Sequence, residues 1–137
     1  MHYDVPGDDF TRAGEASGAV KGKLKQLGFP ANTIRRVAIA MYEGEINMVI
    51  HAGGGRADVE VDPDRVFITL SDNGPGIPNL DLAMQEGWST ATETVRNLGF
   101  GAGMGLPNIK KYSDMLEIDT APGKGTTMYI TILVNNT

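Results

Sequence analysis

Cysteine is absent from the 137 residues of this chain, and long apolar runs are absent as well. Without cysteine there can be no disulfide bond and no cysteine-ligated zinc, which fits the reducing cytoplasm. No stretch approaches the roughly 18 apolar residues of a membrane span. Residues 1–10, MHYDVPGDDF, also lack the apolar segment of a signal peptide. We therefore expect a cytoplasmic protein that is not inserted in a membrane.

Basic residues are outnumbered, with 12 Lys and Arg against 17 Asp and Glu and a net charge of −5 at pH 7. This balance disfavours nonspecific binding to nucleic acid or to anionic membranes, because both attract clustered basic residues. Glycine, in contrast, is abundant, with 18 residues against an average share of about 7%. Many of the glycines lie between residues 53 and 125, which predicts glycine-rich loops within one domain.

The spacing of apolar residues predicts an α/β domain that spans residues 1–137. Asn32 is the expected N-cap of its second helix. The least structured segment, 77–104, is long enough to be a functional loop. We expect an α/β two-layer sandwich, with a mixed, mostly antiparallel sheet of four or five strands covered on one face by three helices. The expected helices are 11–27, 33–52 and 105–115, and the expected strands are 2–6, 56–62, 65–71, 116–120 and 126–134.

A first candidate patch is formed by Glu43 and Asn47, which lie four residues apart on the second predicted helix. This spacing puts both side chains on one face, one turn apart. In isolation the pair has an ordinary interpretation, a solvated carboxylate and an amide that satisfies a backbone group. Glu45 competes for any acidic role, but it projects from the opposite side of the helix.

A second patch is the sequence DNGPGIP, residues 72–78, which follows a predicted strand. Asp72 could accept a hydrogen bond from an exocyclic amine, and Gly74 and Gly76 would let the backbone pass close to a flat ring. Asn-Gly is also a strong turn signal by itself, so a plain turn is the alternative interpretation.

The third patch is GFGAGMGLPNIKK, residues 99–111, in which glycine occupies alternate positions before a predicted helix. The spacing matches neither GxGxxG nor a Walker A loop. A glycine-rich loop that enters a helix offers free backbone N–H groups and the positive end of the helix dipole to an anion. A flexible linker is the alternative, and the helix immediately downstream weakens it.

Together with GKGTT at residues 123–127, these patches resemble, in order, the motifs of the GHKL ATPases. That superfamily, with the Bergerat ATP-binding fold, includes gyrase, the large heat-shock chaperone, histidine kinases and MutL. The resemblance covers residues 10–134. It is nearest to the small bacterial anti-sigma factors and switch serine kinases of partner-switching pathways.

The resemblance implies a histidine-kinase-like ATPase domain that binds ATP and Mg²⁺, with a mobile ATP lid at about 77–104. Glu43 would be the catalytic base, and Asn47 would hold the metal. Asp72 would accept from the adenine amino group, and Thr126 (with Thr127 as a substitute) would join that network. The remaining residues would line the base or wrap the phosphates: Gly74, Gly76, Gly101, Gly103, Met104, Gly105 and Leu106.

Three functions are compatible with the resemblance. The first is a serine/threonine protein kinase that phosphorylates a small antagonist protein of the STAS fold. The alternative is a nucleotide-dependent module that holds a sigma factor or another regulator with little or no catalysis. The bare catalytic domain of a larger sensor kinase is a third hypothesis, and the lack of a phosphoacceptor helix in this sequence disfavours only a kinase that phosphorylates itself. A sheet face carrying Phe67, Tyr129 and Leu133 would suit a homodimer or a partner.

Overall fold

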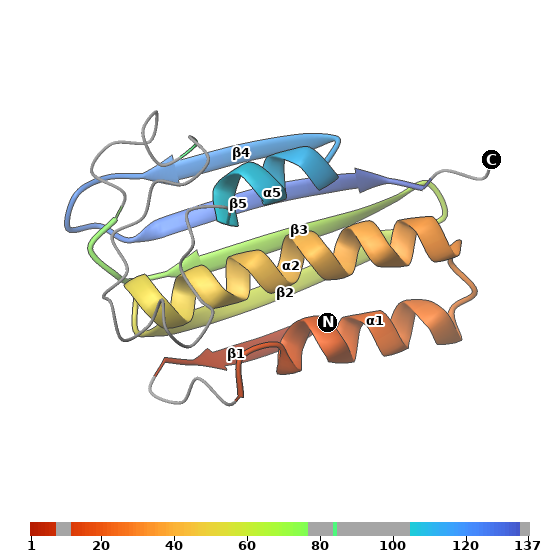
Figure 1. Ribbon diagram of the computed structural model, residues 1–137, viewed down its shortest axis with the longest axis horizontal. Helices are drawn as coiled ribbons and strands as arrows, with labels where there is room; N and C mark the ends of the chain where they lie inside the picture. The colour runs from red at the N-terminus through yellow and green to blue at the C-terminus, as the bar shows by residue number, and fades with distance from the viewer. Residues whose placement is uncertain (8–11, 77–83, 85–104, 135–137) are drawn as a thin grey trace.

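The computed structural model describes residues 1–7, 12–76, 84 and 105–134. One layer is a sheet of five strands, and the second is formed by helices that cover one face of it (Figure 1). Among the described residues, no helix is long and apolar enough to cross a membrane. The elements are β1 (His2–Pro6), α1 (Glu15–Gln26), α2 (Ala31–His51), β2 (Gly54–Asp62), β3 (Arg65–Asp72), α5 (Gly105–Tyr112), β4 (Met115–Thr120) and β5 (Thr126–Leu133).

The strand order is β1-β2-β3-β5-β4, so the last strand of the chain lies inside the sheet. All four neighbouring pairs are antiparallel. The expected α/β two-layer sandwich is therefore confirmed, and in the described part of the chain the sheet is antiparallel throughout. Short turns make this possible, because β2 and β3 form one hairpin and β4 and β5 form another.

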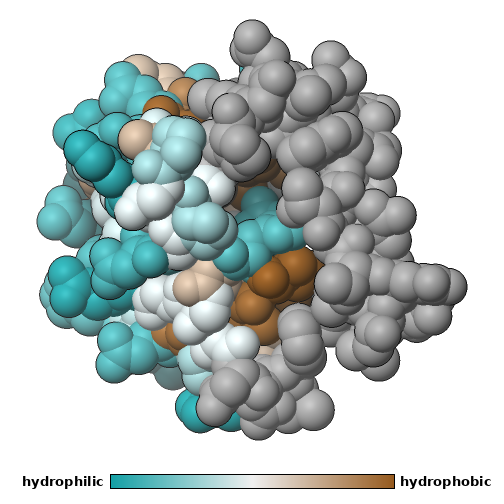
Figure 2. Space-filling view, turned by 90° about the vertical axis from the view of Figure 1, so that its left-hand side faces the viewer, coloured by the Kyte–Doolittle hydropathy of each residue, from teal (hydrophilic) through white to brown (hydrophobic). Residues whose placement is uncertain are grey.

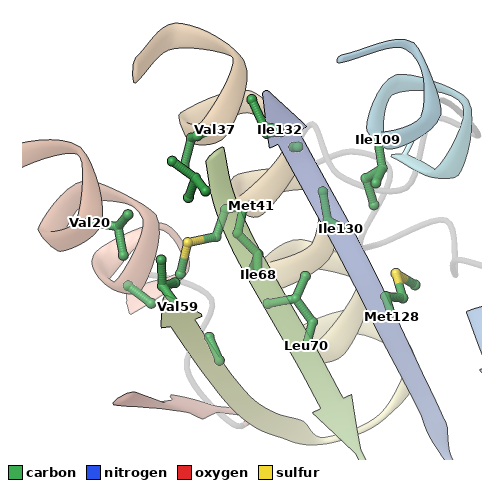
Figure 3. Packing of buried hydrophobic residues seen from close by; sticks show 14 of the residues in the cluster. Val20, Val37, Met41, Val59, Ile68, Leu70, Ile109, Met128, Ile130 and Ile132 are labelled. Carbon is green, nitrogen blue, oxygen red and sulfur yellow. The ribbon is translucent and has the colours of Figure 1, made fainter. Parts of the chain in front are cut away.

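The core lies between the helices and the inner face of the sheet (Figure 3). Alternate residues of each strand point into it, such as Ile68 on β3 and Ile130 on β5, and both are fully buried. Val37 and Met41 come from α2, and Val20 from α1. Burying one such side chain contributes about 1.5–3 kcal/mol. The apolar residues occupy alternate positions of each strand and therefore share one face of the sheet, and the helices cover that face.

The boundaries of α1 and α2 differ from the expected ones mainly at their N-terminal ends, whereas α5 begins as expected and ends at Tyr112 instead of residue 115. Gly14 precedes α1 with a φ of 98°, a left-handed conformation that interrupts the apolar repeat of residues 11–27. The prediction of Asn32 as N-cap is wrong, because α2 begins at Ala31 and Pro30 occupies the cap position without a side-chain hydrogen bond. Proline has its φ fixed, here at −59° with ψ at 144°, and this extended geometry sets the helix start two residues early.

Gly44 explains how α2 lies so close to the sheet. A Cβ atom at this position would lie 2.1 Å from Leu70 Cδ1 of β3. Glycine inside a helix costs about 1 kcal/mol relative to alanine. At Gly44 that cost is offset by the close packing of α2 against β3.

Glu45 also lies on α2, and its carboxylate is buried with 1% of the residue exposed. It accepts hydrogen bonds from the backbone N–H groups of Gly14 at 2.8 Å and Ser17 at 2.7 Å, with Ala16 at 3.3 Å. These donors belong to the start of α1, where N–H groups have no partner inside the helix. Glu45 therefore caps α1 from a neighbouring helix and has no free oxygen to offer to a ligand.

We expect Glu45→Ala to lower the free energy of unfolding by about 2–4 kcal/mol, since it removes charge-assisted hydrogen bonds and leaves buried donors unpaired. Chemical denaturation with urea measures this change. Glu15→Ala, which alters an exposed glutamate in the first turn of the same helix, is the matched control and should change stability much less. Equal losses in the two variants would show that the carboxylate of Glu45 has no special role.

Candidate functional site

The candidate site residues that the structure describes gather at one end of the molecule, on the left in Figure 1. The C-terminal half of α2, the end of β3, the start of β5 and the start of α5 meet there. Figure 2 looks directly at this end and shows hydrophobic and hydrophilic surface side by side. The fold thus brings together three patches that are separated by up to several dozen residues in the sequence.

Asn47 and Glu43 lie on the side of α2 that faces α5. A Cβ atom on Gly105 would lie 3.2 Å from Asn47 Oδ1 and 3.3 Å from Asn47 Nδ2. A side chain at residue 105 would therefore press on the amide, and glycine leaves Asn47 half-buried instead of covered. One turn away, Glu43 Oε1 accepts a hydrogen bond from Asn108 Nδ2 at 3.3 Å.

Burial raises the pKa of Glu43 above its usual value, and the hydrogen bond from Asn108 lowers it by a smaller amount. A carboxylate with a raised pKa is a stronger base, and a general base works best when its pKa approaches the operating pH. Among the residues that the structure describes, Asn108 donates to Oε1 of Glu43, and the second oxygen could accept a proton. The environment therefore suits proton transfer better than a solvated surface carboxylate would.

Asp72 lies at the end of β3, and one of its oxygens is held by the backbone. Oδ1 accepts from Gly74 N at 2.9 Å and from Thr126 N at 3.2 Å. No hydrogen bond reaches Oδ2 from any residue that the structure describes. The carboxylate is therefore fixed in orientation while one oxygen remains able to accept from an amine.

The glycines after Asp72 lie where backbone segments approach closely. A Cβ atom on Gly74 would lie 2.6 Å from Ala52 Cα, at the end of α2. Gly76 has a φ of 77°, and a Cβ atom there would lie 2.2 Å from the Ala121 carbonyl oxygen. This segment is therefore wedged between α2 and the turn that joins β4 to β5, so its glycines do more than form a simple turn.

Thr126 is the first residue of β5 and is buried with 6% exposure. Its hydroxyl lies 2.9 Å from that of Thr120 on β4, and its N–H donates to Asp72. Thr127, the substitute considered above, is the next residue of the strand and points to the other face of the sheet. The structure thus places Thr126, and not Thr127, beside the Asp72 carboxylate.

Leu106 in the first turn of α5 is buried in the core. Gly101, Gly103 and Met104 lie outside the described residues, as does segment 77–104 apart from Met84. Asn108 was missed by the sequence analysis. The sequence offers one signal for it, its place about one helical turn after Gly105. Its partner Glu43 is 65 residues away, so the contact depends on how α2 and α5 pack.

In the described part of the chain, no group of three or more His, Cys, Asp or Glu side chains could hold a metal ion. Mg²⁺ binding does not need such a group, because this ion keeps several waters and takes one or two protein oxygens together with substrate phosphates. The half-buried amide of Asn47, held against Gly105, fits that kind of site.

Comparison with known proteins agrees with this arrangement. Residues 31–136 match the family described as histidine kinase-, DNA gyrase B-, and HSP90-like ATPase. The serine/threonine-protein kinase RsbT of Bacillus subtilis (strain 168) is 33% identical over 106 residues, which cover 74% of each chain. The anti-sigma F factor of Clostridium beijerinckii is 30% identical over 118 residues, or 82% of this chain and 79% of that protein.

A similar fold is found in the mycobacterial sensor histidine kinase MprB, with a TM-score of 0.55. The two chains are 18% identical, and the match covers 97% of this chain and 96% of that one. At this level of identity the likeness concerns the fold alone.

Proposed function

The chain belongs to the family of histidine kinase-, DNA gyrase B- and HSP90-like ATPases, and we propose that it is a kinase that transfers the γ-phosphoryl group of ATP to a serine or threonine of a partner protein. The observation that carries the proposal is the pairing on α2 of Asn47, next to Gly105, with a half-buried Glu43 oriented by Asn108. A half-buried carboxylate with a raised pKa one turn from a half-buried amide is more typical of a functional site than of a solvated helix face.

The nucleotide would lie between α2 and the end of the sheet. Asp72 Oδ2 would accept from the adenine amino group, with Gly74 and Gly76 along the base and Thr126 supporting the carboxylate. The glycine-rich stretch Gly101, Gly103, Met104, Gly105 and Leu106 would wrap the phosphates at the start of α5, where backbone N–H groups favour anions. Segment 77–104 would act as the lid.

Asn47 would hold Mg²⁺, which when bound supplies charge neutralisation of the phosphates. Glu43 would take the proton of the acceptor hydroxyl as that oxygen bonds to the γ-phosphorus and the bond to the ADP oxygen breaks. Phosphoryl transfer depends mostly on positioning and electrostatics. In this chain the positioning would fall to Asn108, which fixes the Glu43 carboxylate, and to the glycines that admit the nucleotide.

The proposed substrate is a small antagonist protein of the STAS type within a partner-switching pathway. The similarity to the kinase RsbT supports this proposal. The similarity to anti-sigma F factors supports the second candidate, a nucleotide-dependent module that holds a sigma factor or a related regulator with little catalysis. A homodimer through the outer sheet face, where Leu133 is 49% exposed and Phe67 stacks on Tyr129 at 6.5 Å, remains a prediction.

The kinase proposal is tested with purified protein, Mg²⁺ and γ-labelled ATP in a lysate of its source organism, with ATP affinity measured separately by calorimetry. Labelling of a small protein on serine or threonine supports the kinase. ATP binding without any labelled protein, when the candidate antagonist is present, favours the binding module. Absence of ATP binding by the intact chain would overturn both.

The contact between Asn108 and Glu43 predicts a shift in the pH dependence of transfer. The base must be ionised, so activity is lost as the pH falls through the raised pKa of Glu43. Asn108→Ala removes the hydrogen bond that lowers this pKa. We therefore expect the acid limb of kcat to move to higher pH in the variant, with kcat recovering at alkaline pH.

The control for this prediction is the same substitution in a Glu43→Gln background. Glutamine does not titrate, so Asn108→Ala should then leave the pH profile of any residual activity unchanged. A uniform loss of kcat at every pH, without movement of the acid limb, would show that Asn108 acts by some other route.

A further inference from the structure

Arg35 differs from the other arginines that the structure describes. Arg12, Arg36, Arg56 and Arg65 each pair with a carboxylate. Arg35 pairs with none among the described residues, and its guanidinium instead lies over the ring of Tyr112, 5.8 Å from the ring centre. Arg35 is exposed, so its guanidinium is accessible to a group from outside the chain.

A second cation converges on the same ring. Lys111 Nζ lies 5.4 Å from the centre of Tyr112. Both Arg35 and Lys111 are exposed, and no ion pair neutralises either of them in the described part of the chain. Each cation is attracted to the ring, and both lie within 6 Å of its centre although like charges repel. An anionic group from outside the chain would relieve that repulsion. We call Arg35, Lys111 and Tyr112 the cationic platform.

The cationic platform lies on the same pair of helices as the proposed catalytic residues. Asn47 meets Gly105, Glu43 meets Asn108, and Arg35 meets Tyr112, so the contacts follow one another along the seam between α2 and α5. Figure 1 shows these two helices side by side on the helical layer. A protein that presents a hydroxyl at Glu43 therefore extends naturally along the seam toward the platform.

We propose that the cationic platform binds an acidic side chain of the protein that receives the phosphoryl group, and thereby positions its acceptor hydroxyl at Glu43. The proposal rests on the kinase function proposed above. Arg35 lies eight residues before Glu43, a rise of about 12 Å along the helix. An extended segment covers about 3.3 Å per residue, so the acidic residue lies about four positions from the acceptor.

The test compares charge reversal on the platform with an equal reversal elsewhere. Arg35→Glu with Lys111→Glu is the test variant. Lys21→Glu with Lys25→Glu, two exposed lysines of α1, is the control with the same change in net charge. The probe is the protein labelled by the wild type in the lysate assay, once purified, and KM and kcat are measured at low and at high salt.

The expected result for the test variant is a rise in KM of about tenfold or more, with kcat and ATP affinity close to wild type. That rise should shrink at high salt, because exposed charges are screened. The control variant should keep the wild-type KM. A second measurement changes the probe. An Asp or Glu near its labelled residue is replaced by Lys. This change should raise the KM of the wild type and should bring the KM of the test variant back toward the wild-type value.

Three results overturn the inference. An unchanged KM in the test variant would show that the cationic platform does not bind the substrate protein, and it would leave the proposed kinase function intact. An equal rise in both variants assigns the effect to net charge alone. If the wild type labels no protein at all although it binds ATP, the kinase function itself fails, and the inference fails with it.

Discussion

Glu43→Ala is expected to lower the rate of phosphoryl transfer by about 10²–10⁴-fold, the usual contribution of a general base, while ATP affinity stays unchanged. The reason is that Glu43 would act on the acceptor hydroxyl, whereas the nucleotide would be held by Asn47, Asp72 and the glycine-rich segments. Initial rates with γ-labelled ATP measure the first quantity, and calorimetry with ATP and Mg²⁺ measures the second.

Glu43→Gln sharpens this experiment. Its amide oxygen can still accept from Asn108, so the local packing is kept while the basic oxygen is lost. Both variants should lose transfer to a similar extent. An exposed carboxylate on the edge strand, Glu117, provides the control, and Glu117→Gln should keep full activity. Transfer by Glu43→Gln at the wild-type rate would falsify the role of Glu43 as the base.

Gly125→Ala is expected to weaken both folding and ATP binding. Gly125 has a φ of 79°, and a Cβ atom there would lie 2.2 Å from the carbonyl oxygen of Asp72. The left-handed conformation costs a non-glycine residue about 1–2 kcal/mol, and relief of the clash adds to that. The backbone of Asp72 must move, which disturbs the carboxylate proposed to receive adenine. We expect a loss of at least about 2 kcal/mol of stability and a clear fall in ATP affinity.

Gly123 supplies a matched control two residues earlier in the same turn. Its φ is 76°, but nothing lies within 4 Å of a Cβ atom built on it. Gly123→Ala should therefore show the conformational cost of about 1–2 kcal/mol without loss of ATP affinity. Thermal unfolding and calorimetry on the two variants separate the cost of the backbone conformation from the cost of the clash with Asp72. Identical ATP affinities of the two variants would argue against an effect through Asp72.

The sequence predicted most of the elements of this fold because their apolar residues repeat strictly. Residues 65–71 alternate between buried and more exposed positions in β3, and residues at three- and four-residue spacing in α2, such as Val37, Met41 and Gly44, are buried. What the pattern could not supply was strand order. Local periodicity says nothing about whether β5 pairs with β3, since that depends on contacts between residues more than fifty positions apart.

In the candidate site, too, some residues could be predicted from the sequence and others only from the tertiary structure. Glu43 and Asn47 share one helix face and Asp72 ends a strand, but the order of the motifs, which resembles that of the GHKL ATPases, is what predicted one site for them. Asn108 and the cationic platform were not found, because each depends on the packing of α5 against α2. Glu45 could be set aside from the helical geometry alone, but its role as a cap of α1 required the tertiary structure.

The place of β5 between β3 and β4 also constrains how the chain acquires its structure during synthesis. β1, β2 and β3 are made first, and the β3 edge then exposes unpaired backbone groups until residues 126–133 emerge from the ribosome. Such an edge can pair with other chains. The site cannot form earlier either, because the Thr126 amide that holds Asp72 belongs to this last strand. Nucleotide binding at the proposed site therefore requires that synthesis has passed β5.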